Sequence, residues 1–258
     1  METLKSPVVA VVGNGPNLEI AQLDMLHKAG IYSVGMNRIY RAYTDTEWRP
    51  DAVFMSDFMR NKPEELGKDL KTHLEMGDYP VIIRGDLGRF LPHTLTNDER
   101  VSAFLDCPHS LAGPPDIDPR GSRSHLNTIE GCSFTTEEWH LPGYCKAGGS
   151  MAVSLQHAAT RPGVRKIVLV GVLGEFYSDE AKNHLWPDYL PADADRTPEQ
   201  AQLDTVNLYG MHQNASKETK KMGIEIVNCS PGSVIKAHRE GELGIELMYD
   251  LELHPPLP

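Results

Sequence analysis

The chain has 258 residues, of which 40% are hydrophobic and 24% are charged, and its formal net charge at pH 7 is −11. This length can form one large domain or two small ones, and the mixed composition predicts a soluble globular protein rather than a disordered one. The acidic balance argues against a nucleic-acid backbone as the main partner, and no apolar run approaches the roughly 20 residues that span a bilayer.

The N-terminal residues show no signal-peptide pattern. The four cysteines are therefore expected to be reduced thiols, and the protein is expected to be cytoplasmic. A metal site is not expected, because the cysteines and histidines lack CxxC or HxxxH spacing.

Residues 7–18 are the most informative stretch, because a strand there is followed by a glycine turn and a helix. The apolar run at 7–12 does not alternate, which predicts a strand covered on both faces. Gly13 and Gly15 allow a sharp turn, and Pro16 can open the helix. Backbone N–H groups at such a turn favour a nucleotide phosphate, although an ordinary strand–helix turn has the same shape. The sequence here is neither GxGxxG nor a Walker A loop.

Further strands are predicted at 31–37, 51–57 and 79–86, and a helix is predicted at 63–76. This alternation predicts an α/β fold with a mostly parallel sheet. Ligands of such sheets lie at the carboxyl ends of the strands. The polar residues predicted at strand ends are Asn14, Asn37, Ser56, Asp57 and Asp86.

The pattern weakens between 87 and 144, where prolines and glycines predict turns. It returns at Gly148, Gly149 and Ser150, which precede an apolar helix. This helix start is either a second phosphate site or a capped helix that packs closely on the sheet. A strongly buried strand is predicted next, at 164–172.

Residues 175–211 are polar, contain prolines and several aromatic residues, and lack a sustained apolar period. An insertion of this length between regular elements predicts an active-site lid. A helix at about 214–222 and a last strand at 223–231 follow.

Several of these segments form a recognisable series. They are VGNGPNL at 12–18, Asn37, AVF at 52–54, the glycine–serine helix start at 148–150, KIVLVG at 166–171, YGMH at 209–212 and NCSP at 228–231. In this order they resemble the bacterial lipooligosaccharide sialyltransferases and, more broadly, the motility accessory factor glycosyltransferases. The resemblance implies a single Rossmann-like domain over residues 1–258, with helices on both faces of the sheet and a lid that closes over a CMP-linked sugar.

The resemblance also implies roles for individual residues. His212 matches the family's general base, a task that suits histidine because its pKa lies near working pH. Taken without the resemblance, His212 is better explained as a helix N-terminal residue with no chemistry. Tyr177 and Tyr189 match the lid tyrosines that stabilise the departing phosphate. The residues expected to bind the nucleotide are Gly13, Asn14, Gly15, Asn37, Ser56, Asp57, Gly148, Gly149 and Ser150.

The sequence departs from the family in two places. Ser56, followed by Asp57, stands where the family has an asparagine, and this carboxylate could hold ribose hydroxyls or a metal ion. The family's Gly-x-Asp corresponds to Gly171-Val172-Leu173, with Glu175 two residues beyond. Both differences weaken the assignment of sialic acid as the sugar.

The leading hypothesis is therefore a glycosyltransferase that moves a sugar from a nucleotide donor, for which CMP is one candidate, to a glycan or other hydroxyl acceptor. It requires no cofactor, and the related enzymes form homo-oligomers. One alternative is a pyrophosphokinase, because the opening strand and turn also resemble the archaeal 6-hydroxymethyl-pterin enzymes. Such an enzyme would hold Mg²⁺ on Asp57 and Asp86. Another alternative is a protein that binds a nucleotide without turnover.

Overall fold

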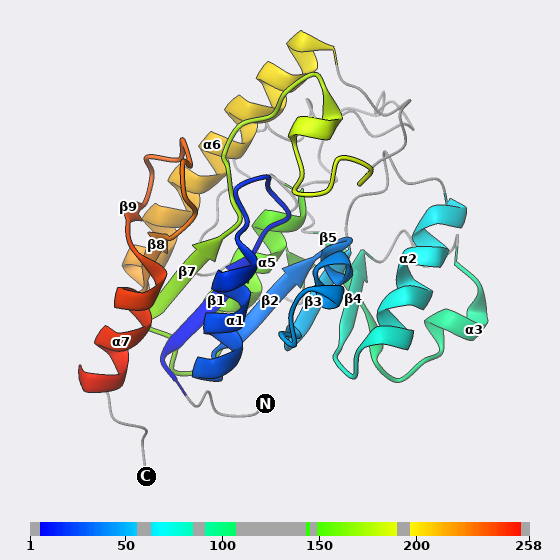
Figure 1. The fold of residues 1–258 in the computed structure, drawn as a ribbon, viewed down its shortest axis with the longest axis horizontal. Helices are drawn as coiled ribbons and strands as arrows, with labels where there is room; N and C mark the ends of the chain where they lie inside the picture. Colours follow the sequence, from blue (N-terminus) through cyan, green and yellow to red (C-terminus); the bar gives the residue numbers. More distant parts are fainter. Residues whose placement is uncertain are drawn as a thin grey trace.

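The computed structural model describes residues 6–55, 63–84, 91–106, 143–144, 149–189 and 197–253. The described strands form one nine-stranded parallel sheet, in the order β6-β5-β4-β3-β2-β1-β7-β8-β9 (Figure 1). Their bounds are β1 Val8–Val12, β2 Tyr32–Met36, β3 Ala52–Met55, β4 Val81–Arg84, β5 Val101–Asp106, β6 Gly143–Tyr144, β7 Lys166–Val170, β8 Glu225–Asn228 and β9 Arg239–Glu240.

Helices connect these strands and cover the sheet. They are α1 Ile20–Ala29, η1 Ile39–Thr44, α2 Pro63–Met76, α3 His93–Thr96, α5 Gly149–Ala159, η5 Glu180–Lys182, α6 Pro198–Lys221 and α7 Leu243–Leu253. The α/β fold with a parallel sheet, predicted from the sequence, is thus confirmed.

Strand β1 shows why the sheet needs cover on both faces. All five of its residues are fully buried. Val8, Ala10 and Val12 belong to a core that also contains residues of α1, α2 and α7, whereas Val9 and Val11 belong to a second core with residues of α5 and α6. Since side chains alternate along a strand, an unbroken apolar run fills both layers at once.

The order of the strands reverses next to β1. Strands β2 to β6 lie on one side of it, and β7 to β9 lie on the other. In sheets of this kind, ligands bind at the carboxyl ends of the strands beside such a reversal. The turn after β1 and the loop after β7 meet there.

The second half of the predicted lid is not an irregular insertion, because residues 198–211 begin the long helix α6. Thr197 caps this helix by accepting a hydrogen bond from the Gln200 N–H at 3.2 Å, and Pro198 occupies its first turn. The buried side of the helix includes Asp204 and His212. These polar residues interrupt the apolar period that predicts a helix from a sequence.

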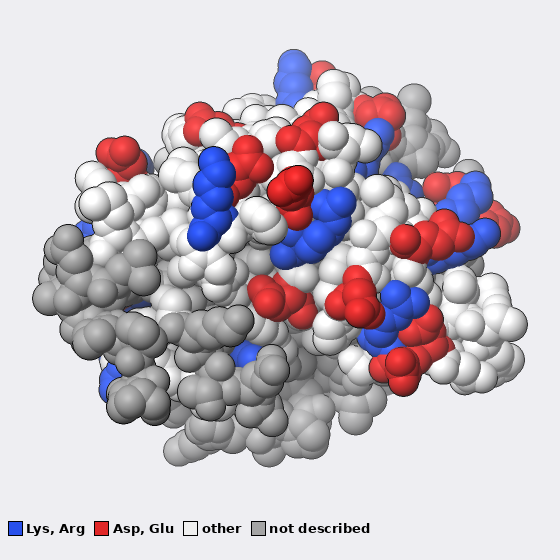
Figure 2. Space-filling view, turned by 60° about the horizontal axis from the view of Figure 1, so that its bottom comes forward, with Lys and Arg blue, Asp and Glu red and all other residues white. Residues whose placement is uncertain are grey.

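Other elements also differ from the prediction. Helix α1 begins at Ile20 rather than directly after Pro16, and no element was predicted for β5, β9 or α7. None of the described helices combines the length and the apolar character that crossing a membrane needs. On the face shown in Figure 2, acidic and basic side chains of the described residues are interspersed rather than gathered by sign.

Candidate functional site

The glycine turn after β1 packs directly on the loop after β7. The Gly13 N–H donates to the Val170 carbonyl at 2.8 Å, and the Gly15 N–H donates to the Gly171 carbonyl at 2.9 Å. A Cβ on Gly13 or Gly15 would lie 2.5 or 2.6 Å from the Gly171 oxygen. The glycines are therefore needed for close approach of two backbones. Their N–H groups are occupied, so the phosphate contact predicted for them is not available in this structure.

Asn14, between these glycines, is 7% exposed. Its Nδ2 donates to the Met36 carbonyl at 2.9 Å and to the Tyr189 hydroxyl at 2.8 Å. Because a carbonyl can only accept, the contact with Met36 fixes which end of the carboxamide is the nitrogen. The Oδ1 atom is then left buried without a hydrogen-bond partner. Asn14 thus joins the ends of β1 and β2 and retains one unused acceptor.

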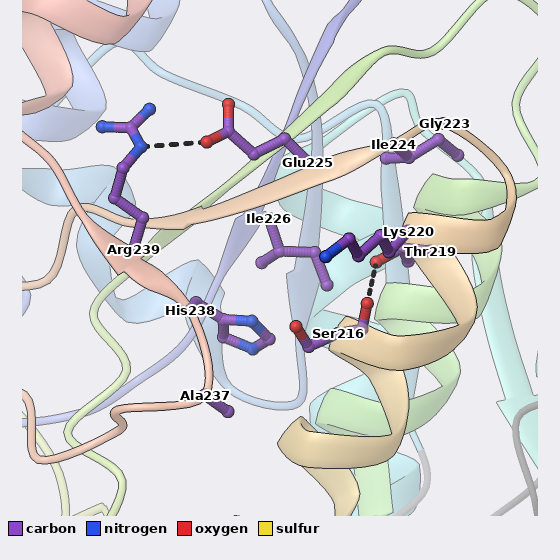
Figure 3. Close-up of a pocket in the computed structure, with 10 residues that line it drawn as sticks. All are labelled: Ser216, Thr219, Lys220, Gly223, Ile224, Glu225, Ile226, Ala237, His238 and Arg239. Carbon is purple, nitrogen blue, oxygen red and sulfur yellow. Dashed lines mark hydrogen bonds and ion pairs between the residues drawn. The ribbon is translucent and has the colours of Figure 1, made fainter.

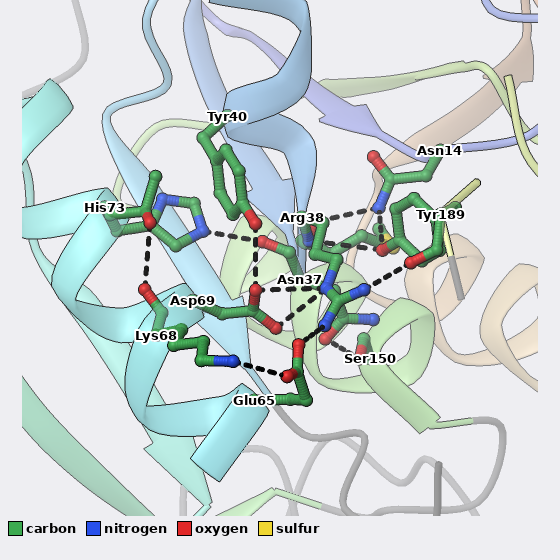
Figure 4. Close-up of polar contacts among 12 residues, drawn as sticks. Asn14, Asn37, Arg38, Tyr40, Glu65, Lys68, Asp69, His73, Ser150 and Tyr189 are labelled. Carbon is green, nitrogen blue, oxygen red and sulfur yellow. Dashed lines mark hydrogen bonds and ion pairs between the residues drawn. The ribbon is translucent and has the colours of Figure 1, made fainter. Parts of the chain in front are cut away.

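Asn37 follows β2 and is the one non-glycine residue in the described part of the chain with a positive φ, at 48°. Its N–H donates to the Phe54 carbonyl at 2.9 Å, and its Oδ1 accepts from the Ser150 hydroxyl at 3.1 Å. A residue held in this region of backbone space often marks a functional site. The start of α5 is thereby tied to the end of β2 (Figure 4).

Arg38 was not predicted as a site residue, yet it is the most highly connected side chain here. Its Nε donates to both oxygens of Asp69, at 3.0 and 2.8 Å, and its Nη2 lies 3.3 Å from Glu65. Its Nη1 donates to the Tyr189 carbonyl, and its backbone N–H donates to the Tyr189 hydroxyl at 3.1 Å. Burial raises the pKa of Asp69, while hydrogen bonds from Arg38 and Tyr40 oppose this shift. Arg38 thus connects β2, α2 and the loop after β7.

Residues 183–189, which we call the covering segment, lie over the turn after β1. The Leu185 N–H donates to the Asn14 carbonyl at 3.0 Å. The His184 ring stacks on Tyr189 with 3.9 Å between ring centroids, and Asp188 pairs with Arg41 at 2.6 Å. These contacts confine the covering segment to the carboxyl edge of the sheet.

The two predicted lid tyrosines have different environments. Tyr189 is 4% exposed, and its hydroxyl accepts from both Asn14 and Arg38. Tyr177 is 39% exposed, and its hydroxyl donates to Glu175, a contact that raises the pKa of Tyr177. Of the two, only Tyr177 presents its phenol at the surface.

The structure does not bring His212 to the asparagines. The ring is fully buried within α6, and its Nδ1 lies 2.9 Å from Nε2 of His238, while its Nε2 has no partner. Burial, followed by the proximity of His238, lowers the pKa of His212 well below its usual value. In this arrangement the ring is closed to an acceptor substrate, so the base role stays a prediction that requires the ring to become accessible.

A pocket of about 400 Å³ lies beside His238, between α6 and the β8–β9 edge (Figure 3). It is lined by the end of α6 and by Glu225 and Ile226, at the amino end of β8. Because the sheet is parallel, this is the edge opposite Asn14 and Asn37. The pocket is therefore separate from the candidate site.

The remaining predicted residues are only partly described. Ser56, Asp57, Asp86 and Gly148 lie outside the described residues, and Gly149 is the first residue of α5. Within the described ranges, no group of three or more His, Cys, Asp or Glu residues could hold a metal ion.

The buried ring of His73, behind the site, predicts a pH dependence of stability. Its Nε2 lies 2.6 Å from the Asn37 carbonyl, and burial lowers the pKa of His73 to about 4 from a usual 6.5. As the pH falls from 6.5 to 4, His73 binds a proton in the unfolded chain but stays neutral in the folded chain. The free energy of unfolding should then fall by about 1.4 kcal/mol per pH unit from this group.

Urea unfolding at several pH values checks this. The variant His73→Gln should lose less stability between pH 6.5 and 4 than the wild type, whereas the exposed His93→Gln should follow the wild type. Parallel curves for His73→Gln and the wild type would contradict the prediction.

No model of a protein family and no curated protein sequence matches the chain. The structure is similar to the MAf glycosyltransferase from Magnetospirillum magneticum AMB-1, with a TM-score of 0.53 and 14% sequence identity. The alignment covers 98% of this chain but 38% of that chain. At this identity the likeness shows a shared fold.

Proposed function

We propose that the protein is a glycosyltransferase that transfers a sugar from a nucleotide donor to a hydroxyl acceptor. The observation that carries the proposal is the gathering of Asn14, Asn37 and Ser150 at the carboxyl ends of β1 and β2, under a covering segment. Ligands of parallel sheets bind at this edge, and the structural neighbour with the same fold is a glycosyltransferase.

The phosphate, nucleoside and sugar of the donor are each assigned to the residues whose chemistry suits them. The donor's phosphate is assigned to the start of α5, because the positive end of a helix dipole favours an anion. Asn14 and Asn37 supply amide groups for the nucleoside or the sugar. Tyr177, whose phenol is at the surface, is assigned to the leaving phosphate, since a phenol donor stabilises developing charge without a metal. His212 remains the base that the resemblance implies.

A thermal-shift panel tests the donor. CMP, CMP-sialic acid, UDP- and GDP-sugars and ATP are each added with and without Mg²⁺. A cytidine nucleotide at about a hundred times its dissociation constant should stabilise the fold by roughly 2.7 kcal/mol without metal. Stabilisation by Mg²⁺-ATP alone would instead favour pyrophosphoryl transfer.

The same preparation then tests turnover and its base. The stabilising donor should release free nucleotide when a hydroxyl acceptor is added. His212→Gln should slow this transfer by about a hundredfold or more while circular dichroism remains that of the wild type. Full activity in His212→Gln would remove the base assignment, and tight binding without turnover of any donor would identify a binding protein.

A further inference from the structure

The carboxamide of Asn14 is only partly used within the protein. Its Nδ2 has two acceptors, Met36 and Tyr189, but its Oδ1 is buried and has no donor. Figure 4 shows Oδ1 pointing away from Tyr189. A buried acceptor left without a partner costs on the order of 1–3 kcal/mol, so its retention at the carboxyl edge of the sheet points to a ligand.

The chemistry of the unused acceptor restricts what that ligand can be. Oδ1 needs a donor, whereas the neighbouring Nδ2 needs an acceptor, a place now taken by the Tyr189 hydroxyl. A phosphate at neutral pH offers acceptors almost alone and would leave Oδ1 unpaired. Two adjacent hydroxyls, as in ribose or in many sugars, supply the acceptor and the donor side by side. The glycine N–H groups that flank Asn14 are also occupied, which again disfavours a phosphate at this turn.

We propose that Asn14 recognises a vicinal diol of the donor, and that Tyr189 occupies the place of one of its hydroxyls until the donor displaces it. This inference rests on the proposed function and adds to it the group that is recognised and a gate. Tyr189 is here a positioning residue, because it acts through Asn14 and the covering segment.

The gate follows from how the covering segment is attached. Tyr189 is held through its hydroxyl by Asn14 and Arg38 and through its carbonyl by Arg38, and Leu185 is held by the Asn14 carbonyl. A ligand that needs Asn14 must first break these bonds. Its apparent dissociation constant is therefore the intrinsic value divided by the fraction of molecules in which the segment has opened.

The test removes the Tyr189 hydroxyl alone. In Tyr189→Phe the covering segment loses two hydrogen bonds, so the Leu185 amide should exchange with solvent about three- to tenfold faster than in the wild type. The ligand that carries the diol, CMP for a ribose diol or CMP-sialic acid for a sugar diol, should bind about three- to tenfold more tightly than to the wild type, because less opening has to be driven by the ligand. Tyr43→Phe is the matched control: Tyr43 is also a buried tyrosine, its hydroxyl donates to Tyr79 at 2.9 Å, and neither measurement should change.

Two further ligands locate the diol. If it belongs to the ribose, 2′-deoxy-CMP should bind Tyr189→Phe at least tenfold more weakly than CMP does. If it belongs to the sugar, CMP and 2′-deoxy-CMP should bind alike, and CMP-sialic acid should bind at least tenfold more tightly than either. Equal affinity for all three ligands would overturn the recognition of a diol.

The outcomes separate the gate from the function. Unchanged exchange at Leu185, or binding of the diol-bearing ligand to Tyr189→Phe that is no tighter than to the wild type, would overturn the gate even if transfer activity is found. If no nucleotide binds to either protein, the proposed function and the diol fail together, whereas faster exchange would still support the gate.

Discussion

Replacing Arg38 by Met is expected to lower the free energy of unfolding by about 3–5 kcal/mol, the usual cost of removing one partner from a buried ion pair. The side chains of Arg38 and Asp69 are only 10% and 4% exposed. Without the guanidinium, the Asp69 carboxylate stays buried, and among the residues that the structure describes its remaining hydrogen-bond donor is Tyr40. The covering segment also loses its bond at the Tyr189 carbonyl.

Chemical denaturation measures this loss. The double variant Arg38→Met/Asp69→Leu should recover much of it, because a buried pair can often be replaced by apolar side chains at little cost. Lys71→Ala is a suitable control, since Lys71 and its partner Glu75 are 65% and 63% exposed, and the change should stay within about 0.5 kcal/mol. A loss below 1 kcal/mol in Arg38→Met would show that the pair does not hold α2 to β2.

Gly13→Ala is expected to cost about 3 kcal/mol, at the upper end of what overpacking a core costs. The new methyl group would lie 2.5 Å from the Gly171 oxygen and 3.3 Å from Cγ2 of Val172. The first of these is a backbone atom, so no side-chain rotation can relieve the contact. The turn after β1 and the loop after β7 would have to move apart, which should also weaken donor binding.

Thermal unfolding and nucleotide titration of this variant check both effects. Gly210→Ala provides a control of opposite sign: Gly210 lies inside α6 and a Cβ there meets no atom within 4 Å. Its replacement should stabilise the protein by roughly 0.5–1 kcal/mol. If Gly13→Ala unfolds like the wild type, the two loops are not packed as described.

Local signals in the sequence were sufficient for some elements and not for others. Helix α2 was predicted with its observed bounds, because Pro63 and the two acidic residues after it mark a helix start. Strand β1 was predicted because its residues are all apolar. The first part of helix α6 was missed because its buried side carries Asp204 and His212, whose burial depends on tertiary partners.

For the candidate site, the sequence predicts the positions of some residues but not the contacts between distant ones. Asn14, Asn37 and Ser150 could be placed at strand ends and at a helix start, since both positions follow from local patterns. The contacts of Tyr189 with Asn14 and Arg38 join residues far apart in the chain. No spacing encodes such a contact, because it arises when the loop after β7 folds over the edge of the sheet. Arg38 was overlooked for the same reason.

The position of β1 at the centre of the sheet has a consequence for synthesis on the ribosome. Val8 pairs with Lys166, so the first strand cannot complete its pairing until β7 has emerged. At about 5–20 residues per second, this delay is on the order of ten to thirty seconds. Throughout it, one edge of an entirely apolar strand has no partner, and such edges promote aggregation. We therefore expect the yield of native protein in cells to depend on chaperones that bind the nascent chain.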